Sequence, residues 1–351
     1  RQFAPSPSAN ARIVRLAPVF GHSHLFQALA KGAKGPAHDE CRGHAGKRFR
    51  IQAPLALGTP EQTLLLALLD VAAEQHRHNP RQCLLEADDG GEVARNLWAA
   101  LYPAGAAPRA QAAPTLMLRT SWAELQRRCG GSNLGGTVLA ARRRGLTRLA
   151  EVLVSETAHA GTPGHTCRLL GFWVDGDACV HVALNHWLAA ALQEPGYAQV
   201  SLCERLQLRS QAAMLTHVFL SSSLSPGNTI TIKYETLVQR LWADAEHDVA
   251  PSTHRRRLSD AQSALKAIAS LPGWRITLEP SKAKVTRLRP ITAFASTSRR
   301  HSAHRFGKRL PTTPGSADDV SQARLFDAPD MSYARQPLLQ ALSSEESPVE
   351  I

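Results

Sequence analysis

Two runs of arginine are the residues of this chain whose type and spacing carry the most chemical information. The segment from Leu125 to Leu149 contains no acidic residue, and a second run occupies positions 255–257. Guanidinium groups bind phosphate through forked hydrogen bonds, and a cluster of one charge sign releases the counterions condensed on a polyanion. The formal net charge of +12 agrees with that chemistry. Both runs therefore predict contact with nucleic acid. The six arginines of the first run are Arg127, Arg128, Arg142, Arg143, Arg144 and Arg148.

No pattern in the sequence predicts a catalytic site, a metal site or a cofactor site. Gly46-Lys47 is the nearest approach to a P-loop, but Arg48 follows it and Cys41 stands where the first glycine belongs. The pairs in His22-Ser23-His24 and His76-Arg77-His78 have no acidic cluster beside them, and we interpret them as loop residues. The six cysteines include no C-x-x-C pair, which argues against zinc or a disulfide framework. We expect a protein that is not an enzyme.

The first arginine run needs a helix, a short turn and a second helix to position it. The first helix is expected from Thr120 or Ser121 to Cys129, the turn at residues 130–133, and the second helix from about Leu134 to Leu149. Strands expected over 151–155 and 168–173 would then form a hairpin. This order of elements is that of a winged helix, a DNA-binding unit. The DNA contacts expected in this unit are Ser132, Asn133, Thr137, Arg142, Arg143, Arg144 and Arg148.

Two features of the second helix weaken this interpretation. Arg142 falls on the apolar side in a helical projection, and Gly145 is expected to break or bend the helix. An ordinary solvated, arginine-rich helix is the alternative.

Residues 179–290 predict the same order of elements again. Helices are expected over 210–221 and 234–242, with a strand at 229–233 between them, and a partner helix begins at Pro251. Apolar residues of that partner helix recur at helical spacing, while arginines and hydroxyl residues lie opposite, as a recognition helix requires. A hairpin is expected over 274–288. The DNA contacts expected here are Ser252, Thr253, His254, Arg255, Arg256, Arg257, Lys282, Lys284 and Arg287, and an exposed charged helix is the alternative.

The predicted fold class is α+β, mainly helical, with two tandem winged-helix domains and a disordered C-terminal tail. Residues 1–20 are expected to be a flexible segment without an initiator Met or a secretory signal, so the natural start is expected upstream. The first domain is expected over 21–195, with a loop insertion near 76–115, and the second over 196–290. Residues 291–351 carry seven basic and seven acidic side chains and form the expected tail. No apolar run is long enough for a membrane span.

Several segments in collinear order resemble replication initiators of IncQ-type broad-host-range plasmids, the RepC family. The similarity covers about residues 18–289, and no single motif in it is as specific as a Walker box. The segments that carry it are Leu25–Leu29, Phe49–Ile51, Leu57–Thr59, Arg168–Leu170, Val180–Ala191, Val200–Leu202, Leu215–His217, Tyr234–Trp242, Ser252–Leu258, Leu265, Leu271 and Gly273–Trp274.

The resemblance implies a tandem winged-helix initiator that binds directly repeated sites, or iterons, in a plasmid origin. It also implies that the protein opens or marks the origin and recruits a separately encoded helicase and primase. This sequence departs from the family pattern in three places. The first hairpin tip, residues 159–164, has no Arg or Lys, the first recognition helix has an extra residue near Gly145, and Asp260 adds an acid to the second reading face.

The predicted function is that of a cytoplasmic bacterial protein whose partner is double-stranded DNA. A homodimer is compatible with the sequence, which does not fix the oligomeric state or the DNA sequence recognised. A transcriptional regulator or a plasmid partition adaptor on the same modules is the first alternative. A protein-interaction module with incidental basic charge is the second.

Overall fold

Helix α2 (Thr59–His78) lies inside the main cluster of buried side chains among the described residues. Residues 61–72 are all buried, and the run Leu64–Leu69 is apolar on every side. A helix that is hydrophobic all round must be covered by other elements. Its N-cap is Gly58, and Glu61 Oε2 turns back to accept a hydrogen bond from the Gly58 amide at 3.0 Å.

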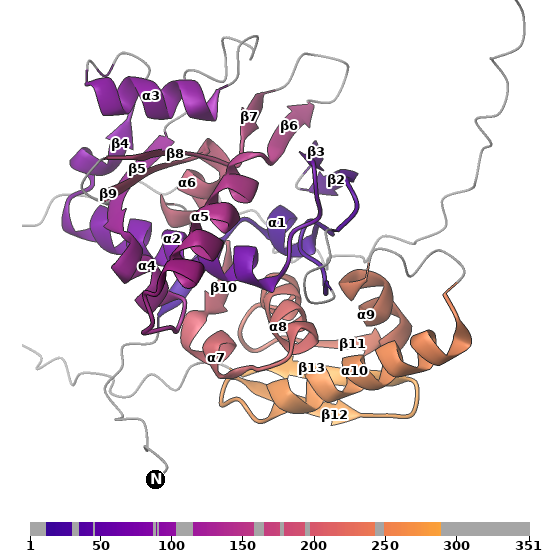
Figure 1. Cartoon of the computed structure of the whole chain (residues 1–351). Coiled ribbons are helices and arrows are strands. Elements are labelled where there is room, and N and C mark those ends of the chain that lie inside the picture. The colour runs from indigo at the N-terminus through magenta and orange to yellow at the C-terminus, as the bar shows by residue number, and fades with distance from the viewer. Residues whose placement is uncertain are drawn as a thin grey trace, which may run out of the picture. The chain divides into compact units, whose positions relative to one another are not determined.

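The computed structural model describes residues 12–29, 35–44, 46–86, 89, 91–102, 115–157, 165–175, 179–193, 197–242 and 249–288 (Figure 1). The other helices are α1 (Pro18–His22), η1 (Arg81–Cys83), α3 (Glu92–Leu101), α4 (Trp122–Arg128), α5 (Gly136–Ala150), α6 (His186–Gln193), α7 (Leu202–Gln207), α8 (Gln211–Ser223), α9 (Tyr234–Leu241) and α10 (Pro251–Ala269). The strands are β1 (Ile13–Leu16), β2 (His38–His44), β3 (Lys47–Ala53), β4 (Leu84–Leu85), β5 (Thr115–Ser121), β6 (Leu153–Thr157), β7 (Thr166–Arg168), β8 (Leu170–Val174), β9 (Cys179–Leu184), β10 (Ala198–Ser201), β11 (Thr229–Lys233), β12 (Trp274–Leu278) and β13 (Lys282–Arg287). The α+β expectation therefore holds as a mixture of helices and strands.

Antiparallel pairing organises the described strands into four sheets, with the orders β1-β10, β2-β3-β6-β7, β4-β5-β9-β8 and β11-β13-β12. The single strand expected over 168–173 is wrong. Thr166–Arg168 pairs with β6, whereas Leu170–Val174 pairs with β9, so this stretch joins two sheets. Leu169 lies between the two strands and is fully buried; its amide donates to the Val152 carbonyl and its carbonyl accepts the Asn185 amide.

The elements expected from 210 to 288 are present in the order α8, β11, α9, α10, β12, β13. Figure 1 shows these elements lying together, in colours that run from salmon to yellow-orange. One face of the sheet β11-β13-β12 carries Trp274, Ala283 and Val285, which are buried in the same cluster as Ala261 and Leu265 of α10. The same cluster also contains buried residues that precede position 195, including those of α2, so the two expected domains share one buried cluster.

Two expected irregular segments are ordered instead. Within the segment expected to be flexible, β1 pairs with β10, because Val14 and Leu16 alternate into the core while the strand supplies hydrogen bonds to Ala198–Ser201. Within the expected insertion at 76–115, α3 buries Leu97 and Leu101 completely. Residues 1–11, 103–114 and the expected tail at 291–351 lie outside the described residues.

Candidate nucleic-acid interface

One helix cap fixes the start of α4, and one glycine lies in the turn between α4 and α5. Ser121 Oγ accepts a hydrogen bond from the Glu124 amide at 3.2 Å, which begins α4 at the expected place. Gly130 has a φ of 82°, the left-handed conformation that glycine adopts most easily. Helix α5 then begins at Gly136. The helix, turn and helix expected here are confirmed.

Arg128 holds α4 against α2, a role that the arginine pattern did not indicate. Its guanidinium donates to carboxylate oxygens of Asp70, Glu74 and Glu124, and its side chain is only 12% exposed. Burial works to lower the pKa of Arg128, but hydrogen bonding to these three carboxylates raises it. Arg128 therefore positions the helix pair and is neutralised within the chain.

Two residues of α5 that were expected to contact DNA are already bonded inside the protein. Arg142 Nε donates to Gln126 Oε1 at 2.7 Å, which explains why Arg142 falls on the apolar side of the helix. Arg148 forms an ion pair with Glu61 at 3.0 Å. The helix is continuous through Gly145, so the expected break is wrong: this buried glycine packs against α2.

The exposed side of α5 retains Thr137, Arg143 and Arg144. The Arg143 guanidinium lies 5.6 Å from the centre of the Trp122 ring, which orients it without neutralising it. Arg144 has no hydrogen bond or ion pair with any described residue. In the preceding turn, Ser132 and Asn133 are also exposed, and Asn133 Oδ1 accepts the Gly135 amide at 2.7 Å.

Helix α10 has the two-sided pattern that its sequence predicts. Ala261, Leu265 and Ile268 are fully buried. The opposite side exposes Ser252, Arg255, Arg256, Asp260 and Ser263. Pro251 occupies the first turn, where its missing amide hydrogen costs nothing.

The basic residues at the start of α10 have different surroundings. Arg256 is exposed, and no described residue pairs with it. Arg255 Nε donates to the Pro251 carbonyl at 3.3 Å, and His254 lies 3.2 Å from Glu235 in an exposed pair. Thr253 is partly buried. Arg256 and Asp260 also border a cleft of about 560 Å³ on the side of α10 that faces residues 27–29.

Arg257 does not present its charge as the sequence suggested. Its side chain is buried, with 8% of the residue exposed, and its guanidinium lies 5.5 Å from the centre of the Trp242 ring. Burial on the aromatic ring takes Arg257 out of reach of a base edge and makes it a packing residue between α9 and α10.

The hairpin after α10 separates its three expected contacts. Lys282 and Lys284 are exposed on β13, and Lys282 pairs with Glu279 at 3.3 Å near the turn. Arg287 is buried, and it donates to the carbonyls of Ser221 at 3.0 Å, Leu224 at 2.9 Å and Gln199. The structure argues against the expectation that Arg287 contacts DNA, because its buried guanidinium donates to three carbonyls inside the protein. The tip of the first hairpin, residues 159–164, lies outside the described residues.

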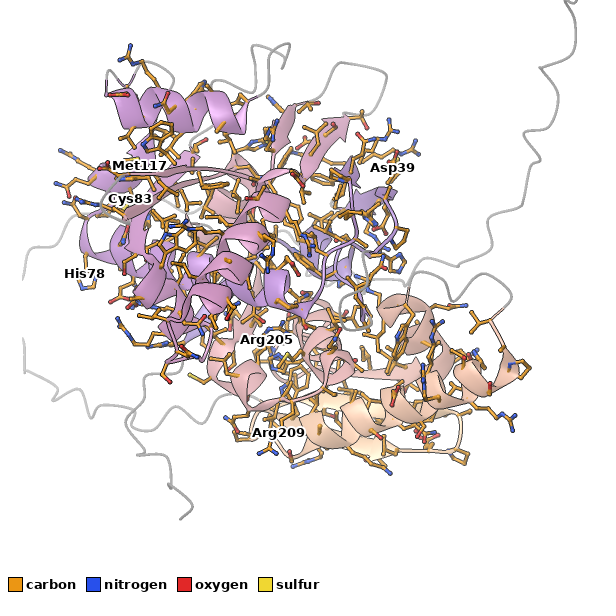
Figure 2. The ribbon with its side chains drawn as sticks, viewed as in Figure 1. Asp39, His78, Cys83, Met117, Arg205 and Arg209 are labelled. Atoms are coloured by element: carbon orange, nitrogen blue, oxygen red, sulfur yellow. The ribbon has the colours of Figure 1, made fainter. Side chains whose placement is uncertain are left out.

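Two further buried arginines, which the sequence did not distinguish from surface ones, join distant elements. Arg205 on α7 is fully buried (Figure 2), where it donates to the Met214 carbonyl at 2.6 Å and to Thr63 Oγ1 at 3.0 Å. Arg240 on α9 donates to the Gly21 and Ser23 carbonyls at 3.0 and 2.7 Å. Burial lowers the pKa of each to about 9. These arginines differ from the exposed ones only in their burial, and no sequence pattern around them indicates that they are buried.

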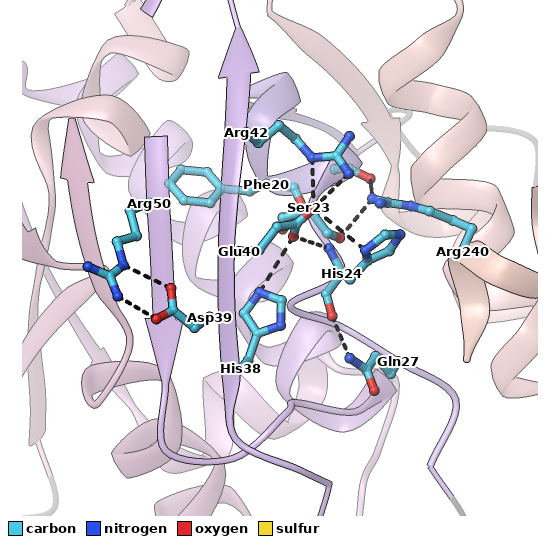
Figure 3. Close-up of polar contacts among 11 residues, drawn as sticks. Phe20, Ser23, His24, Gln27, His38, Asp39, Glu40, Arg42, Arg50 and Arg240 are labelled. Carbon is cyan, nitrogen blue, oxygen red and sulfur yellow. Dashed lines mark hydrogen bonds and ion pairs between the residues drawn. The ribbon is translucent and has the colours of Figure 1, made fainter. Parts of the chain in front are cut away.

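Glu40 on β2 contacts His24, one of the histidines that the sequence singled out near the N-terminus, and also His38 (Figure 3). Its carboxylate accepts the His24 amide at 2.7 Å and the Arg42 guanidinium at 2.6 Å. Burial works to raise the pKa of Glu40, but hydrogen bonds from His38 and Arg42 and the charge of Arg42 lower it to about 2. Burial, reinforced by the charge of Arg240, lowers the pKa of His22 and His24 to about 4.

The segment beside this cluster is tied to α9 by the hydrogen bonds of Arg240 to the Gly21 and Ser23 carbonyls. No group of three or more His, Cys, Asp or Glu suited to a metal ion occurs within the described residues. The interpretation of both histidine pairs as loop residues is wrong in part, because His22 ends α1, and His76 and His78 lie in the last turn of α2. None of the helices in the described ranges is long and apolar enough to cross a bilayer.

Comparison with known protein families shows which family the chain belongs to. The family model described as replication protein C (RepC) matches residues 15–290. The chain belongs to the RepC family. The match covers all of the helices and nearly all of the strands described above, and it confirms the resemblance that the sequence segments carry. Membership places this chain among proteins of plasmid replication initiation.

Two solved structures are similar to the chain. A crystal structure of RctB domains 2–3 has a TM-score of 0.46 at 11% sequence identity and covers 78% of this chain and 97% of its own. A crystal structure of selenomethionine derivatives of domains 2 and 3 of RctB has a TM-score of 0.45 at 11% identity, covering 77% and 97%. No curated protein sequence matches the chain.

Proposed function

We propose that this member of the RepC family is a sequence-specific, double-stranded DNA-binding replication initiator that recognises repeated sites in a plasmid origin. The observation that carries the proposal is the exposed side of α10. It presents Arg255 and Arg256 near the helix start while Ala261, Leu265 and Ile268 fix the opposite side in the core. A recognition helix needs one rigidly buried side and one side that offers forked donors to base edges.

The order of elements supports two winged-helix units, over residues 21–195 and 196–290. The second has the order α8, β11, α9, α10, β12, β13, with α9 and α10 as the helix pair and β11 as the third strand of the hairpin sheet. The first has α4 and α5 followed by the β6–β7 hairpin. We propose α5 and α10 as the helices that enter major grooves at successive repeats.

The DNA contacts proposed on the two helix pairs are those predicted residues that remain exposed or partly exposed and that are not bonded to a buried side chain. On the first unit they are Ser132, Asn133, Thr137, Arg143 and Arg144, and on the second Ser252, Thr253, His254, Arg255 and Arg256. Lys282 and Lys284 are also exposed, but on the hairpin sheet and not on α10. Arg142 and Arg148 act indirectly, by fixing α5 to its neighbours.

The initiator has no catalytic step of its own in this proposal. Binding at several repeats would mark and strain the origin, and a separately encoded helicase and primase would perform the chemistry. A homodimer would place further recognition helices at regular spacing on the repeats.

Substitution of Arg256 by Ala tests the proposal against a control on the same helix. We expect Arg256→Ala to weaken binding to a duplex that the protein selects from a random-sequence pool by about 1–3 kcal/mol. Lys266→Ala, also exposed on α10 but about 15 Å further along its axis, should change binding by less than about 0.5 kcal/mol. Electrophoretic mobility shifts of the full chain measure both.

Equal binding by Arg256→Ala and the parent protein would overturn the role of α10. Failure to bind random duplex DNA with even micromolar affinity at low salt would overturn DNA binding itself and favour the protein-interaction alternative. Replication of an origin-only plasmid in cells separates an initiator from a transcriptional regulator or a partition adaptor, because only the initiator restores replication.

A further inference from the structure

The sheet β11-β13-β12 has an outer face that is exposed along its length. Successive residues of a strand point to opposite faces, and Ala283 and Val285 point into the core. Lys282, Lys284 and Thr286 therefore lie on the other face. The helices α8 and α10 share the core cluster with the inner face only.

Strand register brings four cations together on this outer face. In the strand register, Lys233 of β11 lies directly opposite Lys282 of β13, and Arg275 of β12 lies directly opposite Thr286 of β13. Lys284 is the neighbour of both Lys282 and Thr286 on the same face of β13, two residues from each. Neighbouring strands lie about 4.8 Å apart, and successive residues on the same face of one strand lie about 6.8 Å apart. The four cations therefore lie within an area of roughly 10 Å across the strands by 14 Å along them. We call this patch the outer sheet face. Its members are Lys233, Arg275, Lys282, Lys284 and the hydroxyl residues Thr229, Thr231, Thr277 and Thr286.

The outer sheet face carries more positive charge than the described residues neutralise. Glu279 pairs with Lys282 at the hairpin end, at 3.3 Å. No described residue forms an ion pair with Lys233, Arg275 or Lys284. Like charges directly opposite each other, as in the pair of Lys233 with Lys282, destabilise a sheet. A polyanion that settles on this face would remove that repulsion.

We propose that the outer sheet face binds the sugar–phosphate backbone of a second DNA duplex while α10 holds the first. This inference rests on the proposed function of α10. Lysine ammonium groups and threonine hydroxyls are donors that bind phosphate oxygens without regard to base sequence. The second duplex is therefore bound non-specifically, and one protein molecule bridges two segments of DNA.

Residue types on the face favour duplex DNA over a single strand. Single-stranded DNA is held by aromatic side chains on which its bases stack. The outward positions of β11, β12 and β13 hold only Lys, Arg and Thr, and Trp274 of β12 is buried on the inner side. The face thus offers contacts to phosphates and none to unstacked bases.

The position of Lys284 favours a duplex distinct from the one on α10. Lys284 lies in the middle of the central strand of the sheet, with β11 on one side and β12 on the other. Helix α10 packs with β12 from the inner side, so its exposed side and the outer sheet face are two separate surfaces.

A bridging assay with the full chain tests this proposal. A duplex that the protein selects from a random pool is fixed to beads, the protein is added, and capture of a labelled random-sequence duplex is measured. We expect capture by the parent protein, and a loss of at least about tenfold in Lys233→Glu/Arg275→Glu/Lys284→Glu and, more weakly, in the matching triple Gln variant. Binding of the fixed duplex should stay within about threefold.

The matched control removes the same charge from exposed arginines elsewhere. Arg77→Glu/Arg81→Glu/Arg95→Glu alters residues on α2, η1 and α3, and it should bridge like the parent protein. Thermal unfolding checks that each variant is folded.

The outcomes distinguish this inference from the proposed function. Absence of binding to the fixed duplex by the parent protein would overturn the function of α10. Binding without capture, capture that survives in the triple Glu variant, or equal loss in the matched control would each overturn the second DNA site alone. Preferential capture of a single strand, or an equal loss of fixed-duplex binding in the triple variant, would also overturn it.

Discussion

At the scale of single residues, arginines in this chain divide by where their guanidinium hydrogens go. Arg205, Arg240 and Arg287 donate to main-chain carbonyls inside the protein, whereas Arg144 and Arg256 face solvent. A buried guanidinium must satisfy its donors within the fold, because leaving a buried polar group unpaired costs free energy. The formal charge of +12 therefore overstates the charge that a ligand meets.

Substitution of Arg205 by Met tests this division through stability. We expect Arg205→Met to lower the free energy of unfolding by about 2–4 kcal/mol, because acceptors on α2 and α8 lose their donor. Arg209→Met, which alters an exposed arginine just beyond the end of α7 (Figure 2), should change it by less than about 0.5 kcal/mol. Urea denaturation followed by circular dichroism measures both, and equal effects would contradict a structural role for Arg205.

The half-buried His22 and His24 predict a pH dependence of stability. His22 and His24 have folded-state pKa values of about 4, below the ordinary 6.5, so the unfolded chain binds more protons between these values. Their contribution is complete above pH 6.5 and falls as the pH drops toward 4, by up to about 1.4 kcal/mol per pH unit for His22 and by less for His24, whose side chain is 38% exposed and screened by solvent.

Urea denaturation at pH 7.5 and at pH 5 measures this slope. We expect His22→Gln/His24→Gln to flatten it, whereas His78→Gln, which alters an exposed histidine at the end of α2, should leave it unchanged. A slope that is the same in the double variant and the parent protein would show that these histidines do not titrate as their surroundings require.

At the scale of elements, the helix pair α4–α5 depends on Arg128, whose charge is paired inside the protein. We expect Arg128→Met to release α4 from α2, to destabilise the protein by about 3–5 kcal/mol, and to weaken DNA binding. Its neighbour Arg127, with a 70% exposed side chain, is the matched control, and Arg127→Met should leave stability unchanged within about 0.5 kcal/mol. Thermal unfolding and mobility shifts compare the two variants.

Elements with strong local signals were predictable, and those that depend on distant pairing were not. The Ser121 cap, the stripe of α10 and the strand Thr229–Lys233 follow from caps and periodicity within a few residues. Strand β1 looks irregular in sequence because its partner β10 lies far along the chain. The same reason applies to the division of the strand around Leu169 between two sheets.

At the scale of the whole molecule, phosphate contacts set how binding responds to salt. With about six phosphates neutralised, log K should fall with log salt at a slope of about −5. We expect Arg144→Ala/Arg256→Ala to reduce the slope by about 2, one for each lost phosphate contact. Fluorescence anisotropy across a salt series measures it, and an unchanged slope would mean that these arginines do not meet phosphate.

The sequence by itself determined the kinds and order of most elements, the family and the polyanion chemistry, because these depend on composition, periodicity and short-range caps. Only the tertiary structure decided which arginines a ligand can reach. The residues next to Arg257 and Arg287 in the sequence do not distinguish them from exposed arginines. In the structure, Arg257 is buried against Trp242, and Arg287 is buried where it donates to the Ser221 and Leu224 carbonyls. Burial depends on residues that the fold brings together from distant parts of the chain. A single segment of sequence does not show which distant residues will cover it.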